Sequence, residues 1–141
     1  MTALPWVPDD GGRGGTGRRG DAGDCVVRAL AIASGVPYEE VYESMAAGEA
    51  ARGKPRSARN GVAPKVYKAW LAAHGWVWTP KMAIGSGCTV HCAVGEVPAA
   101  GRLVLRLSGH LVAIIDGRIH DTSDPSRGGT RCVYGWWEAP R

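Results

Sequence analysis

The chain has 141 residues, enough for one domain, and its 45% hydrophobic and 21% charged residues exclude a wholly disordered protein. No apolar run approaches the ~20 residues that span a bilayer, and the N-terminal sequence lacks the basic-then-apolar order of a signal peptide. The four cysteines are too few and too unevenly spaced for a secreted disulfide scaffold, so we expect a cytoplasmic protein with reduced thiols.

Residues 1–23 are rich in glycine and show no periodic apolar face. This composition predicts either a flexible leader or an extended arm packed over the surface, with Trp6 as its anchor. We expect the folded domain to comprise residues 24–141.

Three helices are predicted after this leader. The first runs from Asp24 to Gly35, because DCVVRALAIASG is apolar on nearly every side and ends in glycine; Asp21 and Asp24 are candidate N-caps. The second starts at Pro37, and one apolar stripe follows helical spacing along it: Tyr38, Val41, Tyr42 and Met45. The third runs from Ala63 to His74, with an inner face formed by Val66, Trp70 and Ala73.

The pattern changes after Gly75, where short β-branched or alternating runs are separated by Gly, Pro and Asp-Gly. These runs predict strands at residues 76–79, 103–107, 111–115, 118–122 and 131–134. Helices followed by strands indicate an α+β domain, in which N-terminal helices pack on a C-terminal antiparallel sheet.

The net charge of +4 is unevenly distributed, because residues 50–95 contain no Asp or Glu. The basic residues of this region are Arg52, Lys54, Arg56, Arg59, Lys65, Lys68 and Lys81. We expect a solvated basic face, and the alternative is a contact surface for nucleic acid or an acidic protein.

Cys25 is the first residue of the first predicted helix. Unpaired N–H groups and the partial positive charge of a helix N-terminus stabilise a thiolate, and the same groups can bind an oxyanion. Cys25 is therefore either a candidate nucleophile or a small buried apolar residue.

His110 lies in the segment SGHLVAIIDGRIHDT, in which Asp116-Gly117 predicts a two-residue hairpin turn. In that register Ile115 pairs with Arg118, and Asp121 lies diagonally next to His110 on the same face. An imidazole beside a carboxylate can act as a general base. Side-chain alternation places His120 on the opposite face, although a shift of one residue would exchange the two.

The motifs GDCVVRALA and SGHLVAIIDGRIHDT resemble the papain-like fold in its small bacterial versions. The closest similarity is to peptidase C39-like domains, particularly small proteins of phages and their bacterial hosts, and it covers roughly residues 24–137. The resemblance implies a cysteine peptidase or amidase with a Cys-His-Asp triad: Cys25 as nucleophile, His110 as general base and Asp121 as the residue that orients it. The implied substrate is a peptide or protein with an amide or isopeptide bond.

Papain-like enzymes usually have a Gln oxyanion donor shortly before the Cys, but this chain contains no Gln. Arg18, Arg19 or backbone N–H groups would have to replace it. The alternative is a catalytically weak papain-like module that binds a partner through residues 50–95. A second resemblance, to NlpC/P60 cell-wall amidases, would make His120 the third residue.

Cys88, His91 and Cys92 form a C-x-x-H-C cluster, for which His74 and Cys132 are candidate fourth ligands. Structural zinc sites generally combine two such knuckles, and only one is present here. We therefore predict no metal and no cofactor, and expect the cysteines of this cluster to be buried thiols or turn residues. Cys132, Tyr134 and Trp136 alternate as in a strand, and the final tryptophans are expected to close the core.

Overall fold

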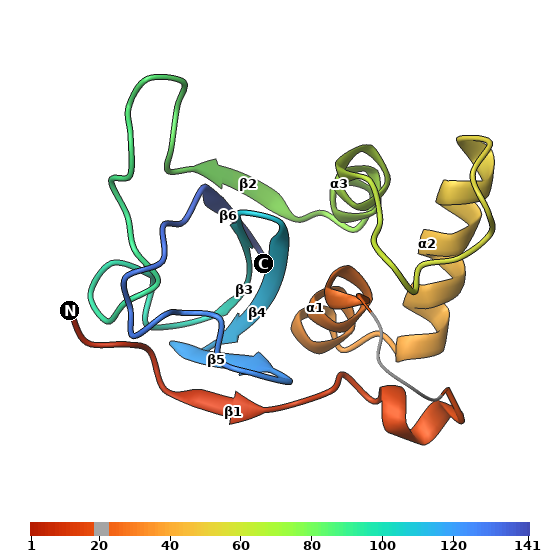
Figure 1. The fold of residues 1–141 in the computed structure, drawn as a ribbon, viewed down its shortest axis with the longest axis horizontal. Coiled ribbons are helices and arrows are strands. Elements are labelled where there is room, and N and C mark those ends of the chain that lie inside the picture. The colour runs from red at the N-terminus through yellow and green to blue at the C-terminus, as the bar shows by residue number, and fades with distance from the viewer. Residues whose placement is uncertain (19–22) are drawn as a thin grey trace.

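The computed structural model describes residues 1–18 and 23–141 (Figure 1). Within this part of the chain the fold is α+β, with three α-helices, one 3-10 turn and a six-stranded sheet. The helices are α1 (Cys25–Ser34), α2 (Tyr38–Ala51) and α3 (Pro64–Ala73), and the 3-10 turn is η1 (Arg13–Thr16). The strands are β1 (Trp6–Pro8), β2 (Val77–Pro80), β3 (Arg102–Leu107), β4 (His110–Ile115), β5 (Arg118–Asp121) and β6 (Gly135–Glu138).

The sheet has the order β1-β5-β4-β3-β6-β2 and is mixed rather than antiparallel. Its later strands pair antiparallel as predicted, but β1 pairs parallel with β5, in the register Trp6↔Ile119. Parallel neighbours need a long connection between them, and here all three helices and three strands supply it. The leader is therefore an arm that extends the sheet, the second of the two forms that its composition allowed.

The helices cover one face of the sheet, where α1 lies against β3, β4 and β5 (Figure 1). α1 ends as predicted, since Gly35 takes the left-handed conformation with φ of 77°. The predicted stripe of α2 is confirmed, because all four of its apolar side chains are buried. These side chains form one core cluster with α1 and with Trp137 of β6.

The inner face of α3 is rotated from the predicted one. Tyr67, Trp70 and Leu71 are buried, whereas Ala73 is exposed and Val66 is only half-buried. The prediction used alanine to mark a buried stripe, and alanine loses little by facing solvent. As a result Tyr67 packs edge-on against Trp137, with the ring centroids 5.8 Å apart.

The opposite face of the sheet is covered by segments without long regular elements, between β2 and β3 and between β5 and β6 (Figure 1). A second core cluster fills this layer and includes Leu105, Val112 and Trp136. The final strand begins at Gly135 rather than within residues 131–134, and in that segment Val133 is the buried residue. The two tryptophans of β6 lie in different clusters and close both cores, as expected.

Candidate active site

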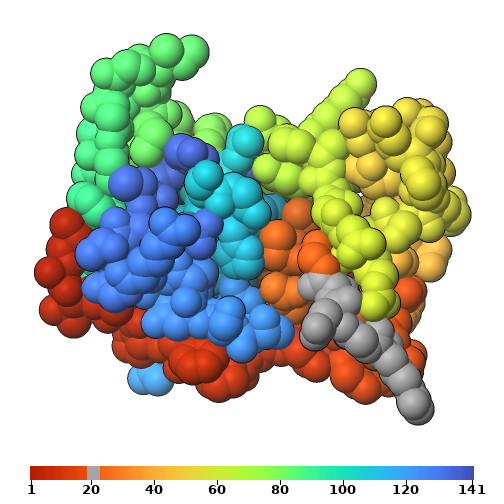
Figure 2. Space-filling view, viewed as in Figure 1, coloured from red at the N-terminus to blue at the C-terminus, as the bar shows by residue number. Residues whose placement is uncertain are grey.

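Cys25 lies at the start of α1 in a cleft of about 480 Å³. The walls come from the first turn of α1, from residues 60–67 and from the β3–β4 turn. In Figure 2, α1 (orange) lies in the hollow between the cyan strands and the yellow-green segment near residue 60. Cys25 is half-buried, its thiol is free, and it lines this cleft.

His110 begins β4, and the predicted hairpin register places it beside Asp121. Ile114 pairs with Ile119, and the two-residue turn forms at Asp116 and Gly117, which both have positive φ. His110 Nε2 lies 2.7 Å from Asp121 Oδ2. The diagonal contact predicted from side-chain alternation is therefore present.

His110 and Cys25 line the same cleft, and each group shifts the pKa of the other. Burial disfavours the imidazolium, but the hydrogen bond to Asp121 and the nearby Cys25 thiol outweigh burial and raise the pKa of His110 to about 9. Burial likewise disfavours the thiolate, yet the proximity of His110 and of the Leu111 N–H outweighs burial and lowers the pKa of Cys25. Both shifts favour a thiolate–imidazolium pair.

The carboxylate of Asp121 is buried and held from several sides. Burial by itself raises its pKa, but contacts with His110, the Thr122 N–H and Arg28 outweigh burial and lower the pKa. The Thr122 N–H donates to Oδ1 at 2.7 Å, and Arg28 Nη2 lies 3.3 Å from the same oxygen. Asp121 is therefore an ionised acceptor in a fixed orientation toward His110.

The N-terminal arm fixes the backbone of Asp121. The indole Nε1 of Trp6 and the backbone N–H of Asp9 both donate to the Asp121 carbonyl, each at 3.0 Å. Trp6 is thus an anchor of the arm, as expected, and Leu4 is a second, buried one.

Asp24 supports this site through an ion pair with Arg28 rather than as a helix cap. It occupies the N-cap position of α1, but its side chain makes no capping hydrogen bond. The buried carboxylate instead accepts hydrogen bonds from Arg28 and from the Tyr38 hydroxyl, the latter at 2.5 Å. Arg28 thereby joins Asp24 to Asp121. The other predicted cap, Asp21, lies outside the described residues.

His120 points away from this cluster, as side-chain alternation predicted. Its Nδ1 lies 3.1 Å from Asp9 Oδ2 in the N-terminal arm. Arg18, one predicted oxyanion donor, forms a two-bond ion pair with Glu39 and stacks on the Tyr42 ring at 3.5 Å, so α2 holds it. Arg19 lies outside the described residues.

Polar residues that the sequence analysis did not single out also line the cleft: Asn60, Tyr67 and Arg106. Burial raises the pKa of the Tyr67 hydroxyl, with a smaller contribution from the nearby charge of Cys25. Tyr67 is therefore a neutral O–H donor close to the sulfur. The helical spacing of Tyr67 relative to Trp70 was a signal for its inward position.

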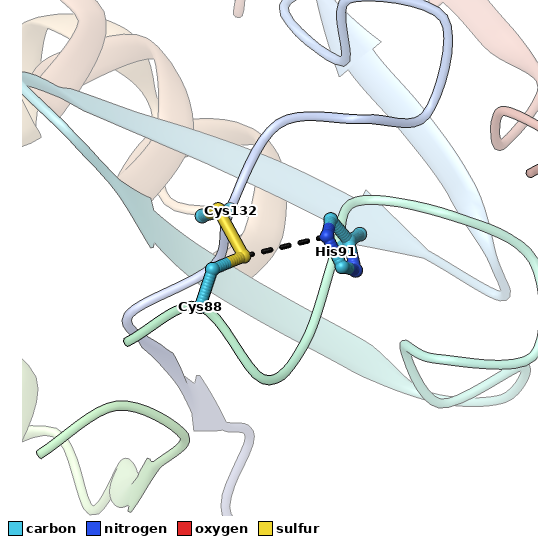
Figure 3. A group of neighbouring side chains, drawn as sticks. All are labelled: Cys88, His91 and Cys132. Atoms are coloured by element: carbon cyan, nitrogen blue, oxygen red, sulfur yellow. Dashed lines mark hydrogen bonds between the residues drawn. A yellow bond between two sulfur atoms is a disulfide. The ribbon is translucent and has the colours of Figure 1, made fainter. Parts of the chain in front are cut away.

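The prediction of a buried thiol is confirmed for Cys92 and wrong for Cys88. Cys88 and Cys132 are joined by a disulfide, so the expectation of reduced thiols is wrong for this pair, and Cys88 is exposed rather than buried (Figure 3). Cys92 is completely buried, and burial raises its pKa to about 11. His74 stacks on Trp70 instead of joining the cluster. Sequence spacing could not reveal the pair because 44 positions separate the two cysteines.

None of the helices within residues 1–18 and 23–141 has the length and apolar character needed to cross a membrane. Comparison with protein-family models, with curated proteins and with solved structures finds no match to this chain.

Proposed function

We propose that this protein is a papain-like cysteine hydrolase that cleaves an amide or isopeptide bond in a peptide or protein. Cys25 is the nucleophile, His110 the general base and acid, and Asp121 the residue that orients His110. One observation carries the proposal: Cys25 and His110 line one cleft, and the His110 ring lies 2.7 Å from the Asp121 carboxylate. This arrangement joins an activated nucleophile to an oriented base.

The reaction follows from this geometry. The Cys25 thiolate attacks the carbonyl carbon, and the carbonyl π electrons move to oxygen to give a tetrahedral intermediate. Collapse of the intermediate breaks the C–N bond, and the His110 imidazolium gives its proton to the leaving amine. Water then attacks the thioester while His110 accepts a proton, which releases the carboxylic acid and regenerates Cys25.

The oxyanion has candidate donors that do not require Gln. The first backbone N–H groups of α1 have no partner within the helix, and the Tyr67 hydroxyl lies in the same cleft. We expect Tyr67→Phe to lower kcat by about 10²-fold with little change in KM, because the lost bond forms in the transition state. Steady-state kinetics on a peptide arylamide would measure this change. Asn60→Ala is the matched cleft variant, and a larger effect there would assign the donor to Asn60 instead.

The labelling of Cys25 by iodoacetamide tests the proposed activation without a known substrate. The lowered pKa of Cys25 and the pKa of about 9 for His110 predict rapid alkylation at pH 7. In His110→Gln the thiol loses its partner, so the alkylation midpoint should move up toward that of an ordinary thiol, about 8.5. Mass spectrometry of the tryptic peptide across pH 5–10 gives the rate at Cys25 alone.

His120→Gln is the matched control for this labelling experiment. It removes an imidazole of the same hairpin, one that contacts Asp9 rather than Asp121. The proposal expects an unchanged Cys25 profile in this variant. A profile that shifts in His120→Gln and not in His110→Gln would contradict the proposal and favour the NlpC/P60-like arrangement.

A binding module with a basic contact surface is the second candidate. Lys54, Lys65 and Lys68 are exposed, whereas Arg52 and Arg56 form ion pairs with acidic residues of α2, which reduces the positive charge available to a partner. Salt-sensitive nucleic-acid binding that persists in Cys25→Ala, together with ordinary reactivity of Cys25, would favour this candidate.

A further inference from the structure

A second group of reactive side chains lies outside the cleft, on the other side of the sheet from α1. Cys88 and His91 belong to the segment between β2 and β3, and Cys132 precedes β6 (Figure 3). The two sulfur atoms and a ring nitrogen of His91 all lie within 4.8 Å of one another. Thiolate and imidazole are the preferred ligands of Zn²⁺ in proteins.

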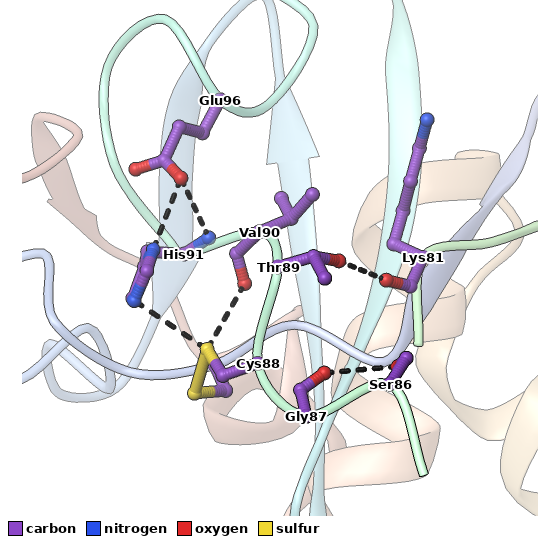
Figure 4. The surroundings of a disulfide bond; sticks show 9 residues. Lys81, Ser86, Gly87, Cys88, Thr89, Val90, His91 and Glu96 are labelled. Carbon is purple, nitrogen blue, oxygen red and sulfur yellow. Dashed lines mark hydrogen bonds and ion pairs between the residues drawn. A yellow bond between two sulfur atoms is a disulfide. The ribbon is translucent and has the colours of Figure 1, made fainter. Parts of the chain in front are cut away.

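Glu96 fixes the orientation of the His91 ring. Its Oε1 accepts a hydrogen bond from the His91 backbone N–H at 3.2 Å and lies 3.0 Å from His91 Nδ1 (Figure 4). This contact turns Nε2 toward Cys88, whose Sγ is 3.4 Å away. A carboxylate on one nitrogen of a histidine, with the other nitrogen facing the ligand position, is the usual outer-shell arrangement of zinc sites.

Backbone hydrogen bonds hold the two segments together independently of the disulfide. The Cys92 N–H donates to the Arg131 carbonyl, and the Val133 N–H donates to the Val90 carbonyl, each at 2.8 Å. His91 and Cys132 face each other across this short bridge. Reduction of the disulfide therefore leaves the thiols and the imidazole next to one another.

We propose that Cys88, His91 and Cys132 form a Zn²⁺ site when the disulfide is reduced, so that disulfide and metal are mutually exclusive states of the same residues. Tetrahedral zinc with ordinary bond lengths requires about 3.6 Å between sulfur and nitrogen and about 3.8 Å between the sulfurs. The first distance is nearly met by the 3.4 Å contact of His91 with Cys88. The second needs only side-chain rotation, because the two Cα atoms are 5.7 Å apart.

Conversion of the disulfide state to the zinc state requires a reductant. A dithiol reductant gives two electrons and two protons to the Cys88–Cys132 bond and becomes a disulfide itself. Zn²⁺ then displaces the two thiol protons and accepts lone pairs from both sulfurs and from His91 Nε2. Because Cys88 is exposed, water can occupy the fourth position.

Metal titration of the full chain in two redox states tests this inference. The oxidised chain and the chain reduced with a phosphine are each titrated with Co²⁺, which reports tetrahedral thiolate ligation by absorption, and the bound Co²⁺ is then displaced with Zn²⁺. We expect one ion per reduced chain and none bound by the oxidised chain. Glu96→Gln should keep the stoichiometry and weaken binding by about 10- to 100-fold, since it affects only the orientation of His91.

The control variants separate this site from the other thiols. Cys25→Ser removes the free thiol of the cleft and should bind Co²⁺ as the native chain does, whereas Cys132→Ser and His91→Gln should lose the spectrum. Circular dichroism checks that each variant folds. In the native sequence, Zn²⁺ should also protect Cys88 and Cys132 from alkylation after reduction. Equal metal binding by oxidised and reduced chains, or loss of binding in Cys25→Ser, would overturn the inference.

Discussion

Cys25→Ala is expected to lower kcat for peptide-bond hydrolysis by about 10⁶-fold, to the level left by binding alone. The substitution removes the atom that attacks the carbonyl, and no other free thiol among the described residues lines the cleft. The measurement is turnover of a fluorogenic peptide-arylamide library, with each residue type presented before the scissile bond. Cys92→Ala removes the other free thiol and should retain activity. Hydrolysis that survives in Cys25→Ala and disappears in Cys92→Ala would contradict the proposed function.

Asp121→Asn provides a graded comparison in the same assay. The amide keeps the shape of the carboxylate but no longer stabilises the imidazolium or the productive tautomer, so we expect a loss of about 10⁴-fold in kcat. It should also lower the pKa of His110 from about 9, because the hydrogen bond and charge of Asp121 raise it. The alkaline limb of the pH profile should then move to lower pH. A purely structural role for Asp121 would leave that limb in place.

Asp24→Ala is expected to destabilise the fold by about 3 kcal/mol, in the range typical when one partner of a buried ion pair is removed. Asp24 is 2% exposed, and its carboxylate contacts both Arg28 and Tyr38. Alanine would leave the Arg28 cation buried, with only the longer contact to Asp121 as compensation. Urea denaturation followed by tryptophan fluorescence gives the free energy of unfolding.

Glu39→Ala is the control for this stability measurement. Glu39 forms an ion pair with Arg18 at 2.8 Å, but it is about half exposed and solvent screens the pair. Its removal should cost less than about 1 kcal/mol. If Asp24→Ala costs no more than Glu39→Ala, the buried network around Arg28 does not stabilise the fold.

The features of the fold that depend on local residue spacing were predictable from the sequence. The helical starts and stops at Pro37, Gly35 and Gly75 and the hairpin turn at Asp116 are encoded within a few residues of where they act. The hairpin turn also set which residue of β5 faces His110, because side chains alternate along a strand. This local information was sufficient to bring His110 and Asp121 together.

Features that depend on distant parts of the chain were not predictable in the same way. The disulfide joins two loops whose proximity follows from how they pack over the sheet. The contact of Arg28 with Asp121 requires α1 to cross β5 at one particular place. The parallel pairing of β1 was hidden because three residues that follow one proline and end in another give too weak a strand pattern.

The hydrogen bond from Trp6 to the carbonyl of Asp121 joins residues 115 positions apart. On the ribosome, Cys25 emerges long before the hairpin that contains His110 and Asp121. Until that hairpin is made, no imidazole lowers the pKa of the Cys25 thiol, and β1 has no strand to pair with. Under the proposed function, the newly made protein therefore acquires its reactive sulfur only after the hairpin of β4 and β5 has been made.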